Sequence, residues 1–143
     1  MSDDQGGQPE GLDLAATATP FMAAAGLVLD EVSADRVVGH IDLSADHHQP
    51  FGIVHGGVYA TAVETAASIG ASVSAMEQGL NVVGVNNNTH FVAAVSEGRV
   101  DVVATPIVQG RTQQLWNVDI TRASDGRLVA TGQLRLQNVA PRT

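Results

Sequence analysis

The chain has 143 residues, a net charge of -8 and no cysteine. This length suits one domain with a single core, and the negative charge argues against nucleic acid as a partner. With that charge a soluble protein with a small-molecule ligand fits better. The lack of cysteine excludes disulfides, a cysteine nucleophile and cysteine-ligated zinc.

The N-terminal part of the chain divides into an acidic tail and an uncharged stretch. Residues 1–13 are rich in glycine and acidic residues, and we expect them to be disordered. Residues 14–29 carry no charge, but no basic residue precedes them and Pro20 interrupts them, so we expect neither an export signal nor a membrane span. We expect a short helix at residues 20–25, a single domain over residues 14–138 and a cytoplasmic location.

The pattern of the next residues predicts two strands and then one long helix. The strands are expected at residues 27–31 and 36–43, with a turn at residues 33–35. The run from Gly57 to Met76 meets no breaker until Gly70 and is hydrophobic nearly all round, which is typical of a buried helix.

Four consecutive strands are expected after this helix, at residues 81–92, 99–108, 113–122 and 128–136. Hairpin turns are expected at Gly110-Arg111 and at Ser124-Asp125-Gly126. This order of elements indicates an α+β fold in which an antiparallel sheet curls round one long helix.

One ionisable residue, Glu64, lies within the predicted helix. No other Asp, Glu, Lys or Arg occurs between Asp46 and Glu77. A carboxylate in an apolar helix costs several kcal/mol unless it is paired or kept neutral, so such a residue is a candidate for function. The structural alternative is a buried carboxylate held by hydrogen bonds from the Asn86-Asn87-Asn88 run.

The start of the predicted helix offers donors for an oxygen that carries developing negative charge. Gly56 and Gly57 leave backbone N–H groups uncovered where the helix dipole is positive. Gln49 and His55 add polar side chains just before them. Such donors together with the Glu64 carboxylate suit the hydrolysis of an activated acyl group.

These residues resemble a motif of the hotdog-fold acyl-CoA thioesterases, especially the branch related to hydroxybenzoyl-CoA and phenylacetyl-CoA thioesterases. In that branch an HGG triplet, here His55-Gly56-Gly57, precedes a central helix that carries an acidic residue, here Glu64. Gln49 and Ser68 fall where the branch has a glutamine before the triplet and a small hydroxyl residue one turn after the acid. The resemblance covers residues 21–137 and implies a hotdog fold and thioester hydrolysis.

The resemblance implies a role for each of these residues. The Gly56 N–H polarises the thioester carbonyl and the Gln49 amide helps to position it. Glu64 acts either as a general base on water or as a nucleophile that forms a mixed anhydride, and the sequence does not separate the two. For His55 we favour a role at the helix N-cap over that of a general base. Ser68 shares the Glu64 face and either holds water or only packs.

The resemblance also implies an acyl-CoA substrate. Arg111 and Thr112 lie in the turn where related thioesterases contact the CoA phosphates, although a solvated turn arginine is the competing reading. Asn88 belongs to a polar run that either lines the pocket or only supplies polar residues to a strand at a dimer contact. The five histidines show no ligand spacing, so no metal and no cofactor are expected.

The helix geometry predicts a homo-oligomer. Gly56 and Glu64 are separated by roughly 12 Å along one helix and by about 80° around its axis, so one thioester should not reach both groups of one chain. Two helices packed antiparallel about a two-fold axis would bring Glu64 of one subunit near Gly56 of the other. We therefore expect a dimer or a tetramer with shared sites.

Two other functions compete with thioester hydrolysis. A hotdog dehydratase or hydratase is disfavoured because Pro50 lies about where the dehydratase branch has its histidine, and because Asp42 and His47 lack the hydratase flanking signature. A non-catalytic acyl-CoA-binding dimer, in which Glu64 is structural, is the third reading.

Overall fold

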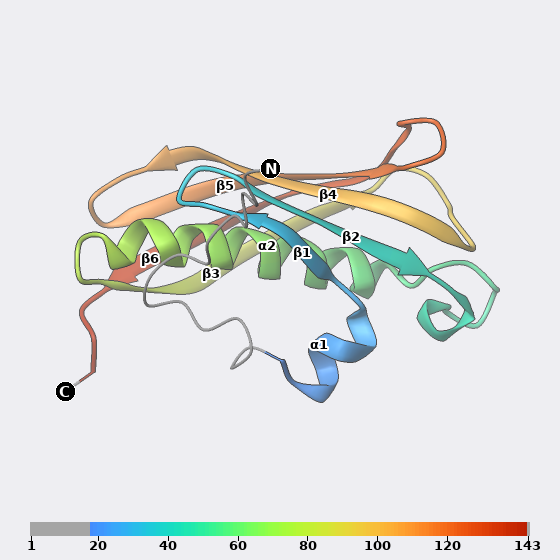
Figure 1. Ribbon diagram of the computed structural model, residues 1–143, viewed down its shortest axis with the longest axis horizontal. Coiled ribbons are helices and arrows are strands. Elements are labelled where there is room, and N and C mark those ends of the chain that lie inside the picture. Colours follow the sequence, from blue (N-terminus) through green and yellow to red (C-terminus); the bar gives the residue numbers. More distant parts are fainter. Residues whose placement is uncertain (1–17, 143) are drawn as a thin grey trace, which may run out of the picture.

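The structure is a computed structural model and describes residues 18–142 (Figure 1). Its elements are α1 (Pro20–Ala25), β1 (Val28–Val32), β2 (Val37–Leu43), the 3-10 helix η2 (Ala45–His47), α2 (Gly56–Met76), β3 (Asn81–Phe91), β4 (Gly98–Gln109), β5 (Gln113–Arg122) and β6 (Leu128–Val139). The expected disordered tail lies outside the described residues. No helix within residues 18–142 is long and apolar enough to span a membrane.

All six strands form one antiparallel sheet, in the order β1-β2-β4-β5-β6-β3. The sheet curves round α2, which lies along its inner face (Figure 1). The core fills the space between them with aliphatic side chains and Trp116, which is fully buried. The expected fold class, an α+β domain with an antiparallel sheet around one long helix, is confirmed.

One face of α2 is not covered by the sheet. Small and polar residues make up this open face, namely Gly57, Thr61, Glu64, Thr65, Ser68 and Ser72, which are exposed or only partly buried. The opposite face is buried and carries alanine, valine and isoleucine side chains. The expectation of a helix that is buried all round is therefore wrong for the single chain.

The buried face of α2 lies very close to the sheet at Gly70. A Cβ atom added to Gly70 would lie 2.4 Å from Cη2 of Trp116 and 3.0 Å from Cγ2 of Val37. The Trp116 ring is itself held, because its Nε1–H donates to Oε1 of buried Gln114 at 2.9 Å. Gln114 in turn donates from Nε2 to the Ala71 carbonyl at 3.1 Å, which fixes the sheet to the helix.

The Gly70→Ala variant should therefore be less stable than the wild type by about 1–3 kcal/mol, which is the usual cost of an overpacked core. Urea unfolding followed by circular dichroism measures this difference. Gly84→Ala is a suitable control, because there an added Cβ meets its nearest neighbour, Oε1 of Glu64, at 3.5 Å. Equal stability of the two variants would contradict the tight contact at Gly70.

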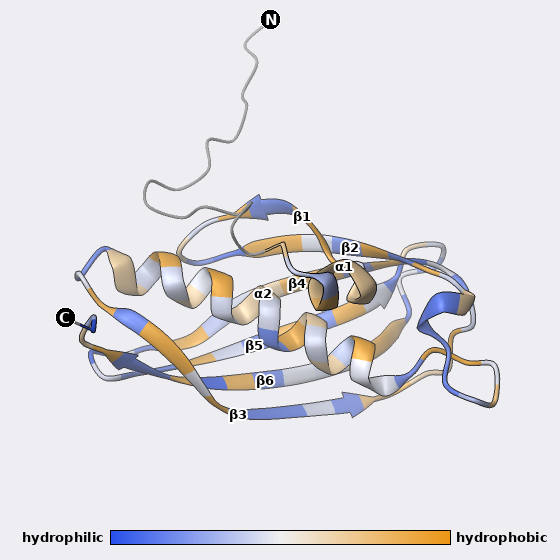
Figure 2. Cartoon of the chain, turned by 90° about the horizontal axis from the view of Figure 1, so that it is seen from below, coloured by the Kyte–Doolittle hydropathy of each residue, from blue (hydrophilic) through white to orange (hydrophobic). Residues whose placement is uncertain are grey.

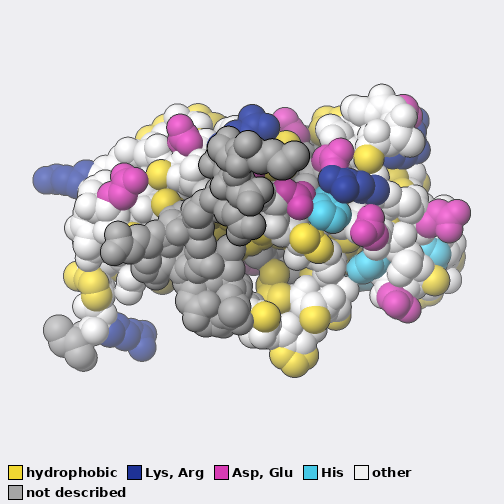
Figure 3. All heavy atoms as spheres, viewed as in Figure 1, with side chains coloured by type: hydrophobic (Ala, Val, Ile, Leu, Met, Phe, Trp, Pro, Cys, Tyr) yellow, Lys and Arg dark blue, Asp and Glu magenta, His cyan; other side chains and the backbone are white. Residues whose placement is uncertain are grey.

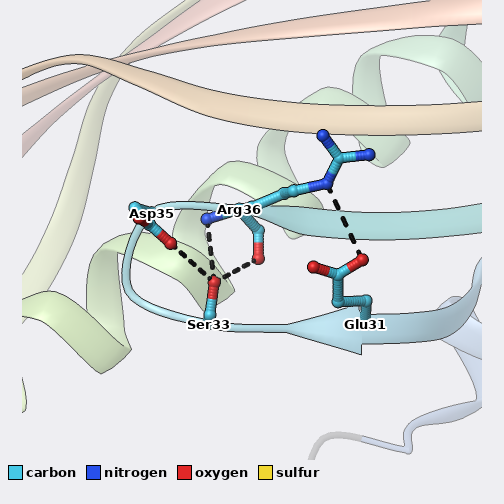
Figure 4. A network of polar contacts seen from close by, with 4 residues as sticks. All are labelled: Glu31, Ser33, Asp35 and Arg36. Carbon is cyan, nitrogen blue, oxygen red and sulfur yellow. Dashed lines mark hydrogen bonds and ion pairs between the residues drawn. The ribbon is translucent and has the colours of Figure 1, made fainter.

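Hydrogen bonds within the turns fix the pairing of the strands that they join. In the β1–β2 turn the Ser33 hydroxyl lies 2.9 Å from Oδ1 of Asp35 and accepts from the Arg36 N–H at 3.1 Å, and Glu31 lies 3.7 Å from Arg36 (Figure 4). In the β5–β6 turn the Arg122 guanidinium, helped by the Arg127 N–H, lowers the pKa of Asp125 to about 2. The turns predicted at residues 33–35 and at Ser124-Asp125-Gly126 are thus confirmed.

The two edge strands of the sheet, β1 and β3, differ in how available they are for pairing with another strand. β1 has five residues, carries Asp30 and Glu31, and contains an irregularity in its pairing between Leu29 and Glu31. β3 has 11 residues, lies at the other edge of the sheet (Figure 2) and pairs only with β6, and nearly all its residues are exposed. The pairing of β3 also has an irregularity, between Gly84 and Asn86, but β3 is long and carries no Asp, Glu, Lys or Arg, whereas a short or charged strand protects an edge from pairing. β3 is therefore the open edge.

Candidate active site

The N-terminus of α2 presents one uncovered backbone donor. His55 is the N-cap residue, and its Nδ1 accepts from the Gly57 N–H at 2.7 Å, while its carbonyl accepts from the Val58 N–H at 3.0 Å. No acceptor within residues 18–142 takes the Gly56 N–H. Because the first N–H groups of a helix need partners from outside it, this donor is available to a ligand.

The N-cap hydrogen bond also determines which nitrogen of the neutral His55 ring carries the proton. An Nδ1 that accepts a hydrogen bond carries no proton, so the neutral ring has its proton on Nε2. The ring nitrogen that could act as a base is thus already used by the helix. His55 is therefore the N-cap residue of α2, and the Gly57 N–H is not available to a ligand.

A cavity of about 320 Å³ lies beside this uncovered donor. Its lining residues are Gln49, Ile53, Val54, Gly56, Tyr59, Phe91, Val92, Ala93, Ala94 and Val95. Gln49 accepts through Oε1 from the Phe51 N–H, and its Nε2 group donates to no acceptor within residues 18–142. The structure therefore brings Gln49 and Gly56 to one cavity, whose other lining side chains are apolar except for Tyr59.

Phe91, the last residue of β3, packs directly on Gly56. A Cβ atom on Gly56 would lie 2.5 Å from Cζ of Phe91, so a side chain there would displace the ring. The Phe91 ring is 60% exposed and lies 6.3 Å from the Tyr59 ring, centroid to centroid. Gly56 thus has two physical reasons to be glycine, the close ring and the exposed backbone.

Glu64 lies on the open face of α2 and is exposed. Its Oε1 is 3.5 Å from the position that a Cβ would take on Gly84 of β3, and no residue within 18–142 makes a hydrogen bond or ion pair with it. Asn87 instead donates from Nδ2 to the Ala60 carbonyl at 3.0 Å. The alternative of a buried carboxylate held by the asparagine run is therefore wrong for the single chain.

Neither Ser68 nor Asn88 makes a hydrogen bond with Glu64 within residues 18–142. Ser68 is one turn further along the same face and is partly buried, and its carbonyl accepts from the Ser72 hydroxyl at 2.7 Å. Asn88 follows Asn87, whose side chain points to α2, so the alternation of a strand places Asn88 on the other side of the sheet. It pairs with Gln133 of β6 and is exposed.

Arg111 and Thr112 lie in the β4–β5 turn and are exposed. Buried Asn138 shapes this turn, because its Nδ2 donates to the Gly110 and Arg111 carbonyls, each at 3.1 Å, and its N–H donates to the Thr112 carbonyl at 2.8 Å. The turn lies near the C-terminal half of α2 and therefore at the opposite end of the helix from Gly56 (Figure 1).

A second cavity, of about 410 Å³, lies on the α1 side of the same helix terminus, and it includes three histidines. His47 accepts through Nδ1 from the Ser44 N–H at 3.1 Å, and Nε2 of His48 lies 2.6 Å from the Ser96 carbonyl. Within residues 18–142, no three His, Asp or Glu side chains are arranged to hold a metal ion. Hydrophobic side chains gather over neighbouring α1 (Figure 3).

The comparison with known proteins identifies relatives that share both sequence and fold. The sequence profile described as "Thioesterase superfamily" matches residues 51–129. A Mycobacterium tuberculosis protein named "Putative esterase" is 44% identical over 125 residues, which are 86% of this chain and 89% of that protein. A 1,4-dihydroxy-2-naphthoyl-CoA hydrolase of Listeria monocytogenes is 35% identical over 96 residues, which are 67% of this chain and 77% of that protein.

Solved structures agree with the sequence matches. The structure of the M. tuberculosis protein superposes with a TM-score of 0.83 at 43% identity and covers 87% of this chain and 100% of that chain. A thioesterase from Haemophilus influenzae superposes with a TM-score of 0.80 at 28% identity, over 88% of this chain and 87% of that chain.

Proposed function

Because this chain belongs to the thioesterase superfamily and is a thioesterase, we propose that it hydrolyses acyl-CoA thioesters with Glu64 as the reacting carboxylate. The observation that carries the proposal is the uncovered Gly56 N–H beside a cavity that also receives the Gln49 amide. Relatives named as 1,4-dihydroxy-2-naphthoyl-CoA hydrolases support CoA as the thiol.

The chemistry follows from where the donors and the carboxylate lie. The thioester carbonyl accepts from the Gly56 N–H, which stabilises the oxygen as it becomes negative during attack. If Glu64 is a general base, it takes a proton from water, the water oxygen bonds to the carbonyl carbon, and the CoA thiolate leaves and is protonated. If Glu64 is the nucleophile, its oxygen displaces the thiolate, and water then hydrolyses the mixed anhydride.

A second copy of the chain is needed to complete this site. Gly56 and Glu64 lie roughly 12 Å apart along α2, and Glu64 is not among the residues that line the Gly56 cavity. The open edge of β3, with exposed Val83 and Val85, offers a surface for antiparallel pairing with another β3. We therefore propose a two-fold homodimer, alone or as half of a tetramer.

The contacts of β3 with α2 explain how such a dimer joins the two groups. Gly84 lies beside Glu64, and Phe91 lies on Gly56. In an antiparallel pair centred near Asn87, Gly84 of one subunit faces the partner strand close to the end that holds Phe91. Glu64 of each subunit then approaches Gly56 of the other, so a dimer has two composite sites.

A panel of acyl-CoA thioesters tests the proposed substrate. It should include short and long aliphatic acyl groups, aromatic acyl groups and 1,4-dihydroxy-2-naphthoyl-CoA. At least one should release free CoA, detected with a thiol reagent, and an equal amount of free acid. Formation of an enoyl or hydroxyacyl product would instead favour a hydratase, and binding without turnover would favour a non-catalytic dimer.

The same acyl groups on a short thiol provide the control. Hydrolysis of these simple thioesters together with inactivity towards every CoA thioester would contradict CoA as the substrate thiol. Arg111→Ala should raise KM for CoA thioesters and leave the rates on the short-thiol esters unchanged if Arg111 pairs with a CoA phosphate.

A further inference from the structure

Tyr59 carries the one buried side-chain polar atom within residues 18–142 that has no hydrogen-bond partner. Tyr59 is 3% exposed, and its hydroxyl makes no contact with any donor or acceptor. Native proteins keep few such groups, because a buried unpaired hydroxyl costs free energy. Phenylalanine would fill nearly the same space without this cost, so the packing of the unliganded chain does not explain the tyrosine.

The position of Tyr59 indicates what the missing partner is. Tyr59 lines the cavity that contains Gln49 and Gly56, and these two are the groups proposed to hold the thioester carbonyl. Among the side chains that line this cavity, only those of Gln49 and Tyr59 have polar atoms. Tyr59 is buried on the side of α2 that packs in the core, and a group that enters this cavity lies beside it.

We propose that Tyr59 is a specificity-determining residue whose hydroxyl donates a hydrogen bond to an oxygen of the acyl group, away from the thioester carbonyl. The inference rests on the proposed function, because the acyl group is taken to occupy the cavity beside Gly56. The enzyme should therefore prefer acyl groups that carry such an oxygen over hydrocarbon acyl groups of the same shape.

The protonation of the Tyr59 hydroxyl and the access of an acyl group to it both fit this role. Burial raises the pKa of Tyr59, so the group remains protonated and can donate at neutral pH. The hydroxyl is covered in the unliganded chain, so a wall of the cavity must move when the acyl group enters. Phe91 is the wall that can move, because it is the last residue of β3 and is 60% exposed in the single chain.

Matched pairs of CoA thioesters test the proposal. Each pair shares a carbon skeleton and differs by one oxygen, for example phenylacetyl with 4-hydroxyphenylacetyl and hexanoyl with 6-hydroxyhexanoyl. The wild type should show about tenfold or higher kcat/KM for the oxygenated member of at least one pair. Tyr59→Phe should bring that ratio close to one and leave the rate on the hydrocarbon member nearly unchanged. Phe91→Leu, as a control, should affect both members alike.

The melting temperature of the ligand-free protein separates this role from a structural one. Tyr59→Phe should melt at or above the wild-type temperature, because the variant removes an unpaired buried hydroxyl. A lower melting temperature with an unchanged ratio would mean that an internal water binds the hydroxyl, and it would overturn the proposal. A wild type without preference in every pair would overturn it as well.

Failure of the proposed function would look different. In that case the wild type would hydrolyse no CoA thioester, and binding of the free acids would decide the role of Tyr59. 4-Hydroxyphenylacetate should then raise the melting temperature of the wild type but not that of Tyr59→Phe. Equal shifts for both proteins would exclude the hydrogen bond.

Discussion

Replacing Glu64 by glutamine should lower kcat for the best thioester by about 100-fold or more, which is the usual contribution of a positioned acid-base group. Glutamine keeps the size of the side chain but can neither take a proton from water nor form an anhydride. The fold should be unaffected, because the Glu64 carboxylate is exposed and holds no other residue within 18–142 in place. Steady-state thiol release measures the loss.

Two measurements make this result specific to Glu64. The melting temperature of Glu64→Gln should stay within a degree or two of the wild type, as for most surface substitutions. Glu77→Gln removes the same charge from the exposed C-cap of α2 and should retain full activity. A Glu64→Gln protein that hydrolyses thioesters at nearly the wild-type rate would exclude Glu64 from the chemistry.

Gln49 should matter less than Glu64, because it is one donor beside the Gly56 N–H. Gln49→Glu keeps an oxygen to accept from the Phe51 N–H but replaces the Nε2 donor by a negatively charged oxygen, whereas Gln49→Ala removes both groups and adds no charge. Gln49→Ala should therefore lose less activity than Glu64→Gln, and Gln49→Glu should lose at least as much as Gln49→Ala, because its charge also repels the oxygen as it becomes negative. Comparable losses of activity for Gln49→Ala and Glu64→Gln would mean that the roles assigned to Gln49 and Glu64 are wrong.

The sequence predicts most of the fold because local signals mark the ends of the elements. Helix α1 lies at the predicted residues, since Thr19 caps it, Pro20 begins it and Gly26 ends it with a φ of 81°. The strands agree to within one or two residues, except that β6 continues to Val139. That extension pairs with Asn81 of β3, which is a long-range contact that no local pattern reveals.

The candidate site was only partly predictable, for the same reason. The HGG triplet and Gln49 mark the helix start by their residue types, and the structure places Gln49 and Gly56 at one cavity. The exposure of Glu64 depends on which face of α2 the sheet leaves open, and apolar content alone cannot decide this. The packing of Phe91 on Gly56 and the unpaired Tyr59 hydroxyl depend on contacts between distant segments, so sequence analysis missed both.

Gly56→Pro should remove the proposed oxyanion donor with little change to the helix. Proline is well accepted at the first helical position, where no intrahelical bond is lost, and His55 before it already has the extended conformation that proline requires, with φ -64° and ψ 131°. Gly56→Ala is the matched control, because its Cβ also displaces the Phe91 ring but its N–H remains. The proline variant should lose about 100- to 1,000-fold in kcat relative to the alanine variant.

Mixing the two inactive proteins, Glu64→Gln and Gly56→Pro, should then restore activity if each site takes Glu64 from one subunit and Gly56 from the other. In the mixed dimer one site carries both substitutions, and the other site carries neither. Random exchange at equal concentrations makes half of the dimers mixed, so activity should recover to about a quarter of the wild-type value. Exchange is followed by native mass spectrometry of differently tagged subunits. Confirmed exchange between two folded variants without any return of activity would show that Glu64 and Gly56 of one chain serve the same site.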